Sequence, residues 1–259
     1  DGFRDRSRSF FKNGALFLIG DSHVEGFRLR EEDGLSRRLE ESLGIPVLNL
    51  GLQGTGPGQE LLRAERALKS YRPLGAIWLL NPTDVPDEIY FKAIASGEPN
   101  PLASPEIANR LSFRLDRWLG GRSRLIQKIS EMQNLQGPFI GFMKNRHFEE
   151  RIHCEALFEG TKRFQKEKIP LVFVLMGQGP TGLRQGYRGL NLDAAAFDRL
   201  ALCAKASGAA VVDFREEFKD SGDYWPGDWH LHSAGTIKFS RILADRLRPF
   251  FGKQPVPSL

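Results

Sequence analysis

The stretch LFLIGDSHVEG, residues 17–27, joins an apolar run to a Gly-Asp-Ser-His turn. Residues 15–20 form a continuous apolar segment of strand length, which predicts a buried strand. The turn that follows has two interpretations. Ser22 can be the N-cap of a short helix, because its hydroxyl accepts hydrogen bonds from free backbone N–H groups. Alternatively, Ser22 is a reactive hydroxyl at the end of the strand, which needs a base from elsewhere in the chain.

Similar apolar segments recur along the chain and alternate with amphipathic helical patterns. The sequence predicts strands at residues 15–20, 45–51, 75–80, 169–177 and 209–214. It predicts helices at residues 31–44, 58–71, 193–207 and 233–251. In helix 58–71 the residues expected to face the interior are Leu61, Leu62, Ala64 and Leu68. Solidly apolar strands that alternate with helices predict an α/β fold, a three-layer α/β/α sandwich with a central parallel sheet of about five strands.

The alternation is interrupted at residues 86–165, where no segment has a convincing strand pattern. Helical stretches lie there instead, joined by pieces rich in proline and glycine. We therefore expect a single domain, residues 1–259, with a helical insertion at 86–165 that covers one end of the sheet. His147 and His153 lie in this insertion and are expected to be structural or solvent-facing.

Charge and cysteine content narrow the partners that the chain can have. The net charge is +5, but the basic residues are scattered through the expected helices, which favours a solvated surface. The chain carries no nucleic-acid-binding motif, and no apolar run approaches the ~18–20 residues of a membrane span. Cys154 and Cys203 show no metal-site spacing. Because Leu200 and Leu202 lie beside Cys203, we expect a buried free thiol there, and the redox compartment stays open.

Polar residues gather in the loops after the expected strands, where open parallel sheets bind ligands. They are Asp21, Ser22, His23, Asn49, Gly51, Gly54, Gly56, Asn81, Thr83, Asp84, Asp228, His230 and His232. A serine needs a base to take its proton, and the base needs a third group to fix its tautomer. Ser22, His230 and Asp228 can supply these three parts.

Other interpretations of the DWHLH segment, residues 228–232, stay open. It can be a plain surface loop, or Asp228, His230 and His232 can bind zinc in a metal-dependent hydrolase. The G-x-S-x-G elbow of α/β-hydrolases is absent. GLQGTG, residues 51–56, does not match a dinucleotide fingerprint, and there is no P-loop. We therefore expect no nucleotide cofactor, and the serine-based interpretation needs no metal.

Four short blocks resemble those of the SGNH, or GDSL-type, hydrolases. They are GDS (residues 20–22), NLGLQG (49–54), NPTD (81–84) and DWHLHSAG (228–235). The blocks follow the family order and span the α/β scaffold, but the resemblance leaves the insertion unassigned. It implies a flavodoxin-like sandwich in which Ser22 is the nucleophile and Asp228 and His230 complete the triad. It also implies that the backbone amides of Ser22 and Gly54 stabilise the oxyanion, and Gly235 fits the family spacing.

One block departs from the family pattern. The third block usually reads Gly-x-Asn-Asp, and its asparagine donates to the oxyanion, whereas Thr83 stands in that slot here, before Asp84. Three outcomes are open: Thr83 donates through its hydroxyl, Asn81 reaches in from a shifted loop, or the oxyanion hole is weakened. Loss of one such donor costs about 10²–10³ in rate. Asp21, Asp84 and His232 are expected to support the site.

The resemblance implies a serine esterase or O-acyltransferase that needs no cofactor and acts on an O-acylated substrate. The GDSH and final blocks look most like bacterial domains that handle O-acyl groups on glycans. An O-acetylated polysaccharide and an extracytoplasmic location are therefore expected. His23 itself is interpreted as the first residue of the helix. The alternative function is a catalytically weakened domain that binds a glycan or a protein, and the oligomeric state is left open.

Overall fold

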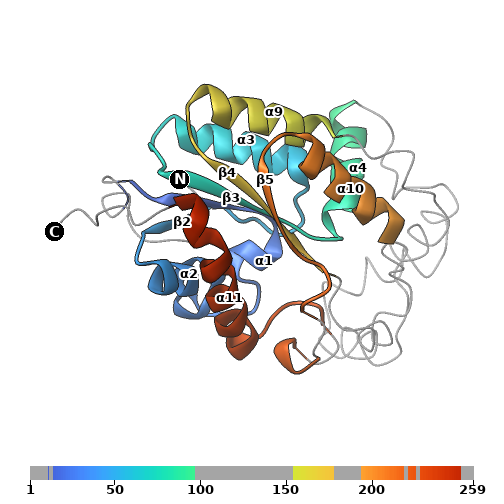
Figure 1. The fold of residues 1–259 in the computed structure, drawn as a ribbon. Helices are drawn as coiled ribbons and strands as arrows, with labels where there is room; N and C mark the ends of the chain where they lie inside the picture. Colours follow the sequence, from blue (N-terminus) through green and yellow to red (C-terminus); the bar gives the residue numbers. More distant parts are fainter. Residues whose placement is uncertain are drawn as a thin grey trace, which may run out of the picture.

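A computed structural model describes residue 11 and residues 14–96, 154–177, 194–218, 221–225 and 228–251 of the chain. Its strands are β1 (Leu16–Ile19), β2 (Val47–Asn49), β3 (Gly75–Leu80), β4 (Leu171–Met176) and β5 (Ala210–Phe214). They form one sheet in the order β2-β1-β3-β4-β5, and every neighbouring pair is parallel. Helices cover the sheet, so the predicted α/β fold is confirmed (Figure 1).

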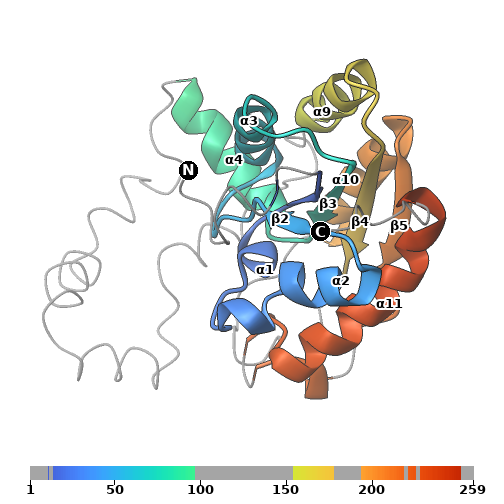
Figure 2. The same ribbon diagram turned by 90° about the vertical axis from the view of Figure 1, so that its left-hand side faces the viewer.

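The helices form two layers, one on each face of the sheet (Figures 1 and 2). One layer contains α3 (Pro57–Leu68), α4 (Asp84–Ala95), α9 (Glu155–Lys166) and α10 (Ala194–Ala206). The other contains α1 (Ser22–Glu25), α2 (Leu35–Leu43) and α11 (Ser233–Phe251), with 3-10 turns at Glu31–Asp33 and Ser221–Asp223. Alternate residues of a strand point to opposite faces, so Phe17 packs with the first layer and Leu18 with the second. Among the helices described, none is long and apolar enough to cross a membrane.

Most elements begin and end near the residues that the sequence predicts. β3 and α11 coincide with the predicted ranges 75–80 and 233–251. β2 is shorter than the predicted 45–51, because the chain turns after Asn49, whose side chain accepts a hydrogen bond from the Gly51 N–H at 2.8 Å. The expectation that Leu62 faces the interior is wrong. Leu61 and Leu68 occupy the buried face of α3, which leaves Leu62 56% exposed.

The strand order reverses between β1 and β3. The chain runs from β1 outward to β2 and then returns to the other side of β1 to form β3. The loops after these three strands therefore meet at the carboxyl edge of the sheet. Gly51 shows how closely they pack, since a Cβ at that position would lie 2.2 Å from the backbone nitrogen of Glu25 in α1. Only glycine lets the β2 loop approach α1 this closely.

Both ends of the predicted insertion, residues 86–165, belong to the layer that contains α3. α4 and α9 each contact α3, and Gly160 of α9 packs against the ring of Trp78, which is fully buried in β3. Residues 97–153, with His147 and His153, lie outside the described part of the chain, as does the glycine-rich loop 178–191. A covering role for the insertion therefore stays a prediction.

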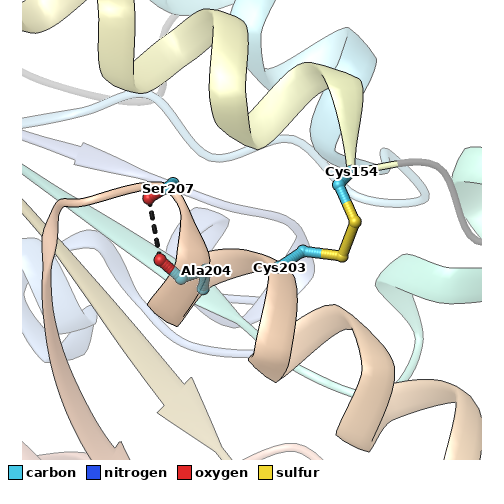
Figure 3. Close-up of a disulfide and its surroundings, with 4 residues drawn as sticks. All are labelled: Cys154, Cys203, Ala204 and Ser207. Atoms are coloured by element: carbon cyan, nitrogen blue, oxygen red, sulfur yellow. Dashed lines mark hydrogen bonds between the residues drawn. A yellow bond between two sulfur atoms is a disulfide. The ribbon is translucent and has the colours of Figure 1, made fainter.

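A disulfide joins Cys154 to Cys203 (Figure 3). The expectation of a free thiol at Cys203 is wrong, although its burial, at 6% exposed, is as expected. Cys154 lies at the N-terminus of α9, which packs beside α10 on the same face of the sheet. This packing brings the two Cα atoms to 5.3 Å across 49 residues of sequence. The pairing is a product of helix packing, which cysteine spacing alone does not reveal.

Candidate active site

Ser22 is the first residue of α1 and not its N-cap. Asp21 holds the N-cap position, where its Oδ1 accepts a hydrogen bond from the His23 N–H at 3.0 Å. The capping interpretation of Ser22 is therefore wrong, because the neighbouring aspartate satisfies the helix terminus. The Ser22 side chain, in a residue only 7% exposed, is left to contact other elements.

The Ser22 hydroxyl meets His230, which lies just before α11. Ser22 Oγ is 2.8 Å from His230 Nε2, and His230 Nδ1 is 2.6 Å from Oδ1 of Asp228. A carboxylate accepts hydrogen bonds, so Nδ1 carries the imidazole proton and Nε2 accepts the proton of the serine hydroxyl. The three residues from the first and last blocks thus lie in the geometry of a Ser-His-Asp triad.

The loop that carries Asp228 and His230 is fixed by its own backbone. Tyr224 and Leu231 pair as an antiparallel bridge. The Trp225 N–H donates to the His230 carbonyl, and the Asp228 N–H donates to the Trp225 carbonyl, both at 3.0 Å. The Asp228 carboxylate also accepts the His230 N–H at 3.1 Å. These bonds hold His230 and Asp228 in one turn, with the two side chains already positioned against each other.

His232 lies outside this triad. Its Nδ1 accepts the Gly235 N–H at 3.0 Å, and its carbonyl accepts the Thr236 hydroxyl, so it supports the first turn of α11. Across the ranges that the structure describes, no three His, Cys, Asp or Glu side chains come together as a metal site would require. Asp228, His230 and His232 therefore do not come together in the way that the zinc interpretation requires.

The loop after β2, which follows the carboxyl end of the strand beside β1, carries Gly54. Asn49 fixes this loop, because its Nδ2 donates to the Val24 carbonyl of α1 at 2.8 Å. Gly54 follows in a left-handed conformation, with φ at +69°. Within the described residues, the N–H groups of Ser22 and Gly54 make no hydrogen bond. The oxyanion role that the resemblance implies for these two amides stays a prediction.

The loop after β3 forms a closed network around Asp21. Thr83 Oγ1 lies 2.6 Å from Asn81 Oδ1 and 3.0 Å from Asp21 Oδ2, so its single proton is already used by an acceptor of this network. Asp84 Oδ2 accepts the Asn81 N–H at 2.6 Å. The Nδ2 group of Asn81 is buried and has no partner within the described part of the chain. Asn81 and Thr83 are the two candidates for the third oxyanion donor. Of these two, Asn81 is the one whose side-chain N–H groups have no acceptor among the described residues.

Behind this network Asp84 belongs to a group of carboxyls whose other members, Glu60 and Asp87, the sequence analysis did not single out. Glu60 is fully buried and accepts the Trp78 Nε1–H at 2.6 Å. Burial, followed by repulsion from Asp21, raises the pKa of Glu60 well above its usual value. Burial and repulsion from Glu60 likewise raise the pKa of Asp84, and burial raises the pKa of Asp87 to about 7. Burial therefore favours the neutral forms of the Glu60 and Asp84 carboxyls.

Aromatic rings surround His230. The rings of His23, Phe27 and Trp229 lie 4.9, 4.6 and 5.7 Å from its centroid. Burial lowers the pKa of His23 to about 4, so this ring is neutral at neutral pH. Because Phe27 follows the GDSH block so closely, its place beside Ser22 could have been inferred from the sequence. The contacts of the Phe27 and Trp229 rings with the His230 ring could not have been inferred in this way.

Arg28 is a further site residue that the sequence analysis missed. Its Nη1 lies 3.1 Å from Asp228 Oδ2. Burial alone would raise the pKa of the Asp228 carboxyl, but hydrogen bonds from His230 and the charges of His230 and Arg28 hold that pKa below its usual value. Asp228 is therefore ionised at neutral pH, as the partner of a catalytic histidine must be.

A small cavity adjoins the Ser22–His230 pair on the α11 side of the sheet. Apart from these two residues, its walls include the side chains of Phe27, Leu29, Met176 and Phe239. Apolar walls beside a nucleophile suit a short apolar group and exclude a charged one.

Comparison with known proteins rests on solved structures, because no protein-family model and no curated protein matches the chain. The fold is similar to that of TesA, with a TM-score of 0.55 at 15% identity over 91% of this chain and 99% of that chain. It is also similar to the lipase/acylhydrolase from Enterococcus faecalis, with a TM-score of 0.53 at 10% identity over 94% and 100%.

A third similar structure is a member of the lipolytic protein G-D-S-L family from Veillonella parvula DSM 2008. Its TM-score is 0.50 at 12% identity over 90% of this chain and 97% of that chain. At these identities the matches bear on the fold. Together with the parallel sheet and the turn after β1, they show that the chain has the fold of the SGNH, or GDSL-type, hydrolases.

Proposed function

We propose that the protein is a serine ester hydrolase whose catalytic triad is Ser22, His230 and Asp228. The observation that carries the proposal is the pair of hydrogen bonds from Ser22 Oγ to His230 Nε2 and from His230 Nδ1 to Asp228 Oδ1, at 2.8 and 2.6 Å. The fold supports it, since the similar structures include a lipase/acylhydrolase and a lipolytic G-D-S-L protein.

In the proposed reaction, Ser22 Oγ attacks the ester carbonyl carbon while His230 Nε2 takes the hydroxyl proton. The carbonyl electron pair moves to oxygen and gives a tetrahedral oxyanion. When that pair returns, the C–O bond to the alcohol breaks, and His230 gives its proton to the leaving oxygen. Water then attacks the acyl-Ser22 ester by the same steps and regenerates the hydroxyl. Asp228 stays ionised and stabilises the imidazolium in both halves.

The oxyanion hole is assigned to the N–H groups of Ser22 and Gly54 and to Nδ2 of Asn81. The first two amides have no partner among the described residues. Asn81 Nδ2 is a buried donor without a partner in the described part of the chain, and such a donor is costly unless a ligand uses it. Thr83 is assigned a supporting role, since its hydroxyl is directed at Asp21 and Asn81.

The acyl group is proposed to be short. The cavity beside Ser22 and His230 is small and mostly apolar, which suits an acetyl group better than a long chain. We expect kcat/KM for an aryl acetate to exceed that for the octanoate by at least about tenfold, since small pockets discriminate by about 1–3 kcal/mol per added group. Equal rates along an acetate, butyrate and octanoate series would contradict the assignment.

The leaving alcohol is proposed to be a hydroxyl of a glycan. An O-acetylated polysaccharide is the substrate, and a sugar hydroxyl in place of water would make the same site an O-acyltransferase. We further propose an extracytoplasmic location in a bacterium. The Cys154–Cys203 disulfide supports it, because disulfides persist in oxidising compartments and are rare in the cytosol.

A second candidate function is a binding module with a weakened site. The observation that favours it is Thr83, which stands in the usual asparagine slot and keeps its hydroxyl turned toward Asp21 and Asn81. Such a domain would hold a glycan or a protein without turning it over.

Labelling with a fluorophosphonate separates these functions. The protein is treated with the probe, and the adduct is located by peptide mass spectrometry, with Ser22→Ala as the test variant. Ser42→Ala is the matched control, since Ser42 lies on α2 and donates to the Arg38 carbonyl at 2.8 Å. We expect one adduct, on Ser22, in the wild type and in Ser42→Ala, and none in Ser22→Ala.

Two further arms complete the experiment. A chelator should leave the labelling unchanged, whereas loss of labelling with the chelator would favour the metal-dependent hydrolase. Absence of an adduct on Ser22, together with no hydrolysis of p-nitrophenyl acetate, would overturn the esterase proposal in favour of the binding module.

A further inference from the structure

Asp228 divides its two carboxylate oxygens between two different partners. Oδ1 accepts both His230 Nδ1–H at 2.6 Å and the His230 backbone N–H at 3.1 Å. Oδ2 faces the Arg28 guanidinium, with Nη1 at 3.1 Å. Asp228 is only 3% exposed, so its second oxygen would be desolvated and unpaired without this arginine.

Arg28 makes this contact from an unusual backbone conformation. Its φ is +60°, a left-handed value that costs a non-glycine residue of order 1–3 kcal/mol. The guanidinium lies 5.4 Å from the centre of the Phe27 ring, and that ring is itself 4.6 Å from the ring of His230. The arginine side chain is 54% exposed, so surface burial does not explain why the strain is kept. The side-chain partner that accompanies this conformation is Asp228.

We propose that Arg28 is a positioning residue for the triad, which fixes the rotation of the Asp228 carboxylate and sets the proton affinity of His230. The inference rests on the proposed function, since it assigns His230 the role of general base. Arg28 itself touches neither the nucleophile nor, by this assignment, the reacting carbonyl. It acts through Asp228.

The sign of the effect follows from the charges around His230. Asp228 lies on its own loop, Asp21 and the neutral His23 lie at α1, and Arg28 lies on the segment after α1. Asp228 favours the imidazolium and the positive charge of Arg28 opposes it. Removing Arg28 should therefore raise the pKa of His230 by about 0.5–1 unit, since the guanidinium is half exposed and screened. A base with a raised pKa is protonated, and so inactive, up to a higher pH.

The experiment compares Arg28→Gln and Arg28→Lys with Arg30→Gln. Arg30 is the matched control, because it lies on the same segment, is 76% exposed and pairs with Asp33 and Glu32 instead of Asp228. We expect Arg28→Gln to move the acid limb of the kcat/KM profile upward by about 0.5–1 pH unit. Its kcat at pH 7 should fall about three- to tenfold with little change in KM, since only the base is perturbed. Arg28→Lys should restore most of the wild-type pH profile and most of the wild-type kcat.

A second readout does not depend on turnover. The His230 imidazole is titrated by NMR in the full chain, with His230→Asn used to assign its signal. An upward shift in Arg28→Gln that is absent in Arg30→Gln supports the proposal. An unchanged or lowered pKa of His230 overturns it. If no ester is hydrolysed by the wild type, the proposed function fails, while this titration still decides the role of Arg28. Arg28→Gly, which also removes the backbone strain, should shift the titration in the same way and guards against misfolding of the glutamine variant.

Discussion

A methyl group built on Gly235 would lie 1.9 Å from the carbonyl oxygen of Asp223, so α11 begins in direct backbone contact with the 3-10 turn before it. The same carbonyl accepts the His232 N–H at 3.1 Å, and Lys238 of α11 pairs with the Asp223 carboxylate at 2.6 Å. The contact fixes α11 against the turn that leads into the His230 loop. The family spacing of this glycine thus has a steric cause.

Gly235→Ala should separate these two segments and displace His230 from Ser22. Because a shift of about 1 Å in a catalytic group costs about 10²-fold in rate, we expect a loss of that order in the rate of fluorophosphonate labelling. The neighbouring Ala234→Ser, at an exposed position, is the control and should label normally. Unchanged labelling of Gly235→Ala would show that the contact does not position the base.

The Asn81 amide, which has no hydrogen-bond partner among the described residues, predicts that Asn81 and Thr83 of the third block respond differently to substitution. Asn81→Ala should lower kcat about 10²–10³-fold, the cost of one oxyanion donor. Thr83→Val should cost less, because its hydroxyl serves Asn81 and Asp21 and not the oxyanion. Steady-state kinetics on an aryl acetate measure both. The opposite ranking would assign the donor role to Thr83.

The disulfide predicts a large difference in stability. Cross-linking across 49 residues lowers the entropy of the unfolded chain, which corresponds to about 4 kcal/mol in the free energy of unfolding. We expect Cys154→Ser, Cys203→Ser and the double variant to be destabilised by similar amounts in urea denaturation. A reducing agent should lower the free energy of unfolding of the wild type to that of these variants. A single variant that is as stable as the oxidised wild type would argue against the cross-link.

Asp87 predicts how stability depends on pH. Burial, followed by repulsion from Asp21, raises the pKa of Asp87 to about 7 in the folded protein, from an ordinary value of 3.8. Between these values the unfolded chain loses the proton while the folded chain keeps it, so stability from this residue falls as pH rises toward 7. Above pH 7 the loss is complete.

Asp87→Asn removes the carboxyl whose ionisation lowers the stability of the folded protein as pH rises. The variant should be more stable than the wild type by about 1–2 kcal/mol at pH 8 and equal to it near pH 3.5. Thermal unfolding at the two pH values tests this. Asp245→Asn, at an exposed carboxylate of α11, should show no such difference between them.

The elements that were predictable from the sequence are those whose pattern is local. β3 is apolar at all six positions because both of its faces are buried, and α11 repeats its buried residues at helical spacing. The grouping of Ser22, Asp228 and His230 was also predictable, from the polar loops and from the resemblance to the SGNH blocks, and the three side chains do lie in contact. The topology then explains their meeting, because the loops after β1 and β5 open on the same edge of the sheet.

What the sequence could not supply depends on contacts between distant elements. No local pattern marks Arg28, whose importance comes from the left-handed backbone and the carboxylate of Asp228. The partner of Cys203 was missed for the same reason, since only the packing of α9 against α10 brings Cys154 near it. Leu62 was misplaced because a helical stripe of leucines is wider than the face that α3 buries. That the Asn81 Nδ2 group has no partner among the described residues can be learned only from the positions of its neighbours in the fold.

Ser22 follows the first strand of the sheet, whereas His230 immediately precedes its last helix, 208 positions along the chain. The hydroxyl therefore meets its base only when the intervening strands have taken their places and α11 has docked. A growing chain that ends before residue 228 carries the turn with Ser22 but neither Asp228 nor His230, the other two members of the proposed triad. If Ser22 is the proposed nucleophile, its activation depends on completion of the fold, and partly made or partly folded chains should not react with a fluorophosphonate.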